Sequence, residues 1–120
     1  MLECLEALKQ DLPRYEPVKF KGAISSDLAT VYTMTDCHVG MKAWGKETGA
    51  DWDLEIAENT LVSCFEEMVD SAPNSEIGVV AQLGDFLHAD SINPITPTSG
   101  HLLDADDRFS KVVQVAIRIL

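Results

Sequence analysis

LATVYTMTDCHVG, residues 28–40, joins an apolar run rich in β-branched and aromatic side chains to an aspartate and a histidine. This composition predicts a buried strand over residues 28–35. EIGVVAQLGDFLH, residues 76–88, has the same design, with a second buried strand expected over residues 76–83. Residues 52–70, between the two runs, carry apolar side chains at helical spacing. Strand, helix and strand of these lengths predict a βαβ unit with parallel strands.

The segments before and between these elements are less regular. Residues 1–27 are expected to form an N-terminal part, with a helix over residues 1–12 and a connector that holds a short strand near residues 18–20. Residues 40–50 contain three glycines and are expected to form a loop. A longer loop is expected over residues 89–103, where proline, glycine and serine gather.

A last helix is expected from about Asp104 to Leu120, with the acids Asp106 and Asp107 in its first turn, where negative charge suits the helix dipole. Natural domains seldom stop on such an apolar helix end. We therefore expect residues 28–120 to be a truncated, βαβα portion of a larger α/β sheet domain. The strand edge left unpaired by such a truncation predicts a homo-oligomer.

Charge and cysteine content narrow the function classes. Nine Lys and Arg against twenty Asp and Glu give a net charge of −11, which argues against a simple electrostatic DNA-binding module. A bound divalent cation reverses the local sign, so an enzyme on phosphate substrates is still allowed. The three cysteines form no CxxC pair, which favours a reducing, cytoplasmic compartment. No apolar run approaches the roughly 20 residues of a membrane span, so no membrane association is expected.

Both expected strands end in side chains that bind metals. Asp36 and His38 follow the first strand, and Asp85 follows the second. Ligands of open parallel sheets bind at the carboxyl ends of the strands, so these three side chains are expected to form one cluster. Carboxylate oxygen with imidazole nitrogen suits Mn, Fe or Zn better than Ca. Asp85 is the natural bridge between two metals, and such sites hydrolyse phosphoesters.

The D-x-H-x-G block at residues 36–40, followed by the G-D-x-x-H block at residues 84–88, resembles the calcineurin-like metallophosphoesterases. His88, at the end of the second block, is most similar to the SbcD-type branch of DNA double-strand-break nucleases. The resemblance implies a sheet sandwich, two Mn²⁺ ions (Fe or Zn being possible replacements) and phosphodiesterase activity of the exonuclease kind on DNA. It also implies metal ligation by Asp36, His38 and Asp85, and a catalytic contact of His88 with the substrate phosphate or leaving group. Nucleases of this branch commonly have an ATPase partner.

The chain departs from this family in its later motifs. The family pattern has a Gly-Asn-His block and two late histidine ligands, whereas the histidine that remains in this chain is His101, in the expected loop. Most of the second metal site is therefore missing. We expect this chain alone to bind one metal weakly and to turn over poorly or not at all.

Alternative interpretations stay open beside this one. The same ligands suit a phosphatase for small phosphoesters, and the net charge of −11 suits a non-catalytic acidic interaction domain. Cys37 is expected as a buried filler rather than a ligand. Trp44 and Trp52 are expected to pack against the first long helix rather than to stack on a base.

Overall fold

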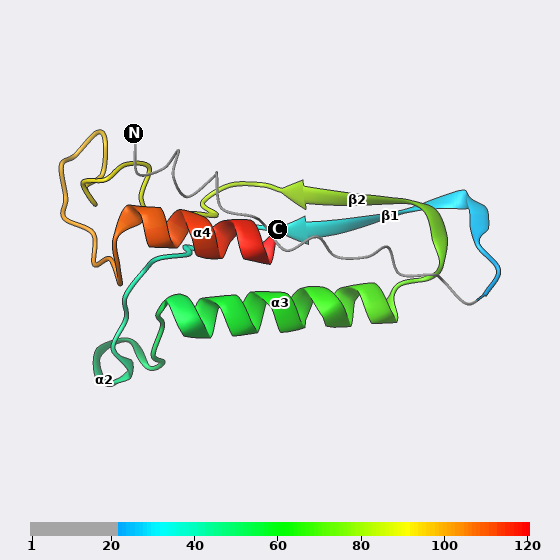
Figure 1. Ribbon diagram of the computed structural model, residues 1–120, viewed down its shortest axis with the longest axis horizontal. Coiled ribbons are helices and arrows are strands. Elements are labelled where there is room, and N and C mark those ends of the chain that lie inside the picture. Colours follow the sequence, from blue (N-terminus) through cyan, green and yellow to red (C-terminus); the bar gives the residue numbers. More distant parts are fainter. Residues whose placement is uncertain (1–21) are drawn as a thin grey trace.

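The computed structural model describes residues 22–120 and contains a two-stranded parallel sheet with helices beside it (Figure 1). The expected helix over residues 1–12 and the strand near residues 18–20 lie outside the described part. The elements follow in the order β1 (Ser25–Met34), α2 (Gly45–Thr48), α3 (Leu54–Ser71), β2 (Ser75–Gln82) and α4 (Phe109–Ile119). This order confirms the α/β class and the βαβα sequence of main elements. Two details differ, since residues 25–27 of the expected connector belong to β1 and the glycine-containing loop holds the single-turn helix α2.

The strands pair in parallel and in continuous register from Ala29 opposite Ile77 to Met34 opposite Gln82. At the start of the pair, the hydroxyls of Thr30 and Ser75 lie 2.8 Å apart in a hydrogen bond. Helix α3 supplies the crossover between the strands, as expected for parallel neighbours. The carboxyl ends of both strands therefore lie at the same end of the sheet, next to the C-terminal end of α4 (Figure 1).

Two carboxylates hold the first turn of α3. Asp53 is the N-cap, and its Oδ1 accepts a hydrogen bond of 2.8 Å from the amide of Ile56. Asp106 reaches across from the segment before α4, and its Oδ2 accepts a bond of 2.9 Å from the amide of Leu54. Free amides at a helix start need such acceptors. The caps therefore fix α3 both within its own sequence and to a distant segment.

The last helix begins later than expected, at Phe109 rather than near Asp104. Residues 104–106 are extended because they pair with the segment after β1: the amide of Lys42 donates to the carbonyl of Asp104, and the amide of Asp106 donates to the carbonyl of Gly40. The expectation that the acidic run starts α4 is therefore wrong. Tertiary pairing overrides the local preference, and Asp106 caps α3 instead.

A small core joins the two long helices to the strand ends. Its buried side chains are Met34, Cys37, Val39, Leu54, Val112, Val115, Ala116 and Ile119. Helix α4 approaches so closely that a Cβ on Gly40 would lie 2.8 Å from Val112 Cγ1, and Gly40 itself has a φ of 96°. On the outer side, the guanidinium of Arg118 donates to both oxygens of Glu58 at 2.6 and 2.7 Å, which ties α4 to α3.

The strands are not buried on both faces, contrary to expectation. Tyr32 contacts Phe65 of α3, and Met34, on the same side of β1, joins the core with α4. Helix α3 therefore packs on one face of β1, and the alternate residues face solvent: Val31 is 58% exposed and its partner Val79 is 44% exposed. Among residues 22–120, no helix is long and apolar enough to cross a membrane.

Asp106→Ala should lower the free energy of unfolding by about 1–3 kcal/mol, because it leaves the Leu54 amide and Lys42 without their acceptor. The hydrogen bond from Leu54, and then that from Lys42, holds the pKa of Asp106 below its usual range. A carboxyl with a lowered folded-state pKa stabilises the fold above its unfolded pKa of about 4, and this contribution is lost as the pH falls through the folded value. Urea unfolding at pH 7 and at pH 3 should therefore show a smaller difference between variant and wild type at pH 3. Asp104→Asn, at an exposed acid of the same run, is the control and should change little at either pH.

We also propose that a second copy of the chain covers the bare face of the sheet, a surface other than the unpaired strand edge from which the sequence predicts a homo-oligomer. Light scattering should then show a dimer or larger species that dissociates in Val79→Asp, because two copies of this variant would bring like charges together. Leu102→Asp makes the same change at a loop residue that is 85% exposed, and it should keep the wild-type state. A monomeric wild type at high concentration would contradict the proposal.

Candidate metal centre

The segments that follow β1 and β2 stay paired beyond the sheet. The amide of Asp36 donates to the carbonyl of Gly84 at 3.1 Å, and the amide of His38 donates to the carbonyl of Asp85 at 2.9 Å. Two further bonds join Val39 to the other segment, from its amide to the carbonyl of Phe86 at 2.8 Å and from the amide of His88 to its carbonyl at 3.0 Å. Val39 is also fully buried, so its side chain anchors this extension in the core. We call these four bonds the strand-end ladder.

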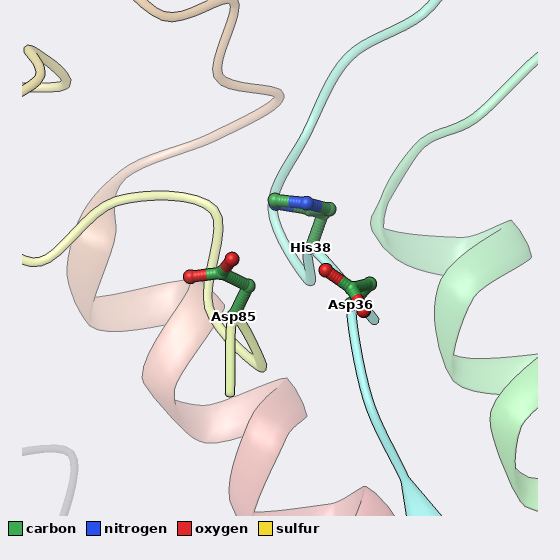
Figure 2. Close-up of side chains that lie close together, drawn as sticks. All are labelled: Asp36, His38 and Asp85. Carbon is green, nitrogen blue, oxygen red and sulfur yellow. The ribbon is translucent and has the colours of Figure 1, made fainter. Parts of the chain in front are cut away.

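The ladder brings the three expected metal ligands together. Ligand atoms of Asp36, His38 and Asp85 all lie within 4.8 Å of one another. Figure 2 shows these side chains on the two segments that leave the sheet, with Asp36 and His38 on one and Asp85 on the other. His38 is half-buried, whereas both carboxylates are exposed. The cluster predicted from the strand ends is thus present, and it opens to solvent.

The same three residues have an unusual backbone. Asp36, His38 and Asp85 have φ values of 52°, 45° and 47°, and among residues 22–120 they alone combine a positive φ with a side chain. Such a conformation is uncommon outside glycine, although Asp and His tolerate it better than most residues. Sparsely populated backbone states of this kind cluster at functional sites, where the surrounding structure holds them in place. Here the strand-end ladder supplies that restraint.

Two neighbours of the cluster were assigned only in part from the sequence. Thr35 donates a hydrogen bond of 2.6 Å from its hydroxyl to Oδ2 of Asp36, and a threonine directly before an aspartate was the available signal. Gly84 precedes Asp85, and a Cβ there would meet nothing within 4 Å, so close packing does not require glycine at this position. The requirement for glycine comes instead from its φ of 135°.

His88 lies against the cluster without belonging to it. Its Nδ1 is 3.4 Å from Nδ1 of His38, and the two rings meet edge to face with their centroids 5.4 Å apart. Partial burial, and then the neighbouring His38, lower the pKa of His88, while Asp104 opposes the shift. A neutral His88 carries one N–H donor and one acceptor nitrogen. The sequence placed His88 near the site, but the direct contact between the two imidazoles was not anticipated.

The other candidates lie apart from the ligand cluster or are built into the packing. Cys37 is buried in the core, and burial, together with the nearby Asp36, raises the pKa of its thiol, so it is a filler rather than a thiolate ligand. His101 is exposed in the loop, as expected. Trp44 is 55% exposed beneath the ammonium of Lys46, so its expected packing against the long helix is wrong. Trp52 is half-buried and pairs through its backbone with Ala43.

Two carboxylates and one imidazole form a chemically suitable set for a transition-metal ion such as Mn²⁺ or Zn²⁺. Three protein ligands leave coordination positions for water and substrate. Asp36, His38 and Asp85 are the one group of three or more such ligands among residues 22–120. The described part of the chain therefore supports one ion, and a second ion has no comparable set of ligands there.

Comparisons with known proteins found no relative of this chain, so the assignments above depend on its own residues. No protein-family model matches the chain, and neither a curated protein nor a solved structure matches it.

A calorimetric titration should detect one Mn²⁺ per chain, with affinity reduced at least about 10-fold in Asp85→Asn because one of three ligands is lost. Asparagine tolerates the positive φ of Asp85, so this variant changes the charge while preserving the backbone. Asp90→Asn removes an exposed acid of the following loop and should bind as the wild type does. Equal affinity in all three proteins would place the ion elsewhere.

Proposed function

We propose that this chain carries a metal-dependent phosphodiesterase site of the metallophosphoesterase type, with DNA as the leading substrate. The observation that carries the proposal is the convergence of Asp36, His38 and Asp85 at the carboxyl ends of two parallel strands. All three have a positive φ, so the chain departs from its ordinary backbone at the residues that gather the ligands. The D-x-H and G-D-x-x-H motifs, and the family resemblance that they carry, also support a phosphodiesterase site.

The proposed roles follow from position. Asp36, His38 and Asp85 would hold the ion, and Thr35 orients the carboxylate of Asp36 through its hydrogen bond. When bound, a divalent ion polarises the phosphoryl oxygen and lowers the pKa of a bound water. His88 would donate a hydrogen bond to the phosphate or to the leaving oxygen, since its ring lies beside that of His38.

A phosphatase for small phosphoesters is the second candidate. Two observations favour it: the net charge of −11, which opposes long polyanions, and a compact cavity whose wall includes His88. Both candidates use the same metal ligands. They differ in the size of the group attached to the phosphate, so substrate preference separates them.

The test is hydrolysis by the full chain with Mn²⁺, measured in parallel on linear DNA, bis(p-nitrophenyl) phosphate and p-nitrophenyl phosphate. We expect slow cleavage of the diesters that is abolished by EDTA and reduced to background in Asp85→Asn. His88→Ala should lose about 100-fold or more in kcat, because it removes the proposed hydrogen-bond donor to the phosphate or leaving oxygen. Asp90→Asn is the matched control and should keep the wild-type rate.

Each outcome has a defined meaning. Metal-dependent cleavage that Asp85→Asn leaves unchanged would contradict the proposal. So would a complete absence of Mn²⁺ binding, and it would favour a non-catalytic acidic domain, whereas Mn²⁺ binding without hydrolysis is the result expected if turnover needs the missing second metal site. Faster cleavage of the monoester than of either diester would favour the small-molecule phosphatase.

A further inference from the structure

A cavity of about 170 Å³ lies beside the metal-ligand cluster, between the segment after β2 and the start of α4. We call it the α4 cavity. Its lining includes the apolar residues Val39, Ile92, Phe109 and Val112, and the polar residues His88 and Arg108. It is smaller than the roughly 300–1,000 Å³ of pockets for drug-sized ligands, so a single ring system suits it better than an extended chain.

The α4 cavity adjoins the proposed metal site through His88. Val39 directly follows His38, and His88 contacts His38 with its ring. The strand-end ladder binds Val39 and His88 to each other through a backbone hydrogen bond of 3.0 Å. A group that fills this cavity and touches His88 is therefore one imidazole away from a metal ligand. A separation of one imidazole ring between the cavity and a metal ligand suits a phosphoester whose phosphate binds the ion and whose organic part fills the cavity.

The residues that line the α4 cavity indicate which kind of organic group could bind there. Ile92, Pro94 and Phe109 contribute apolar side chains to the lining. Ser91 and Arg108 contribute polar atoms: the Ser91 hydroxyl donates to the carbonyl of Asn93 at 2.7 Å, so its oxygen can accept, and Arg108 can donate. Asp107, also in the wall, is paired with Lys111, which offsets its charge. A lining that combines apolar side chains with hydrogen-bond donors and acceptors suits a nucleobase, which has an apolar ring and polar edge atoms.

We propose that the α4 cavity is the subsite for the nucleobase of a nucleoside phosphoester. This inference rests on the proposed phosphoesterase function and adds the substrate class. The nucleoside could be the terminal residue of a DNA strand or a free nucleotide, since both present the same base. A second, more open cavity of about 550 Å³ is lined by His88 as well, together with Trp52 and Met41, and is the competing location.

The test compares ligands with and without a base by calorimetry in the presence of Mn²⁺: adenosine monophosphate, ribose 5-phosphate and inorganic phosphate. The wild type should bind adenosine monophosphate about 10-fold or more tighter than ribose 5-phosphate, because a base gains apolar contacts. Ala89→Leu fills the α4 cavity and should abolish this preference while leaving Mn²⁺ and phosphate affinity unchanged. Ala50→Leu makes the same change in the larger cavity and should retain the preference.

The remaining arms separate the possible failures. Absence of a base preference in the wild type, or its survival in Ala89→Leu, would overturn the proposal, as would its loss in Ala50→Leu alone. If Ala89→Leu does not fold by circular dichroism, Arg108→Gln decides instead: it changes an exposed side chain and should weaken the preference several-fold, whereas an unchanged preference would overturn the proposal.

The metal-free arm distinguishes this inference from the proposed function. If the wild type binds no Mn²⁺, the proposed function fails, and adenosine alone is then titrated against wild type and Ala89→Leu. Binding that Ala89→Leu abolishes still supports the cavity, and no binding overturns it. Where the preference is found, tighter binding of a dinucleotide than of the mononucleotide identifies a strand end as the source of the base. The reverse identifies a free nucleotide.

Discussion

The strand-end ladder is the constraint on which the rest of the structure depends. Four backbone hydrogen bonds carry the pairing of β1 and β2 beyond the sheet, from Asp36 to His88. Backbone bonds of this kind fix register, and a slip by one residue would turn every side chain to the other face. The ladder therefore determines at once which side chains gather at the metal centre and that Val39 enters the core. Site and core share one set of bonds.

This sharing explains how three unfavourable backbone conformations persist in a small structure. Each residue with a positive φ and a side chain carries a conformational cost of order 1–3 kcal/mol, and Asp36, His38 and Asp85 all have one. The ladder and the buried Val39 offset that cost locally. The apolar face left open on the sheet shows that little stabilisation comes from the strands' far side. The folded state thus concentrates its packing around the strand ends and α4.

Many of the acidic side chains have structural roles, although the chain carries a large net negative charge. Acids outnumber bases by eleven, yet several acids have structural partners: Asp53 and Asp106 cap α3, Glu58 binds Arg118, and Asp107 binds Lys111. Asp36 and Asp85 are exposed and face the same opening, where a cation would reduce their mutual repulsion. The cluster is therefore the part of the described surface whose charge most favours a bound divalent ion.

Local patterns in the chain are enough to predict the two strands, α3 and the gathering of Asp36, His38 and Asp85, because alternation, helical spacing and the rule for parallel strand ends are local or topological. They fail where distant segments compete for the same groups. The local sequence predicts that Asp106 starts α4. In the structure its carboxylate accepts from the amide of Leu54 and its own amide donates to the carbonyl of Gly40, so it lies before the helix. Burial of the strands also depends on what packs against each face of the sheet. Here α3 packs on one face of β1, and the other face stays exposed. The contact of His88 with His38 and the α4 cavity arise from side chains fifty or more residues apart or on separate elements, so no spacing along the chain encodes them.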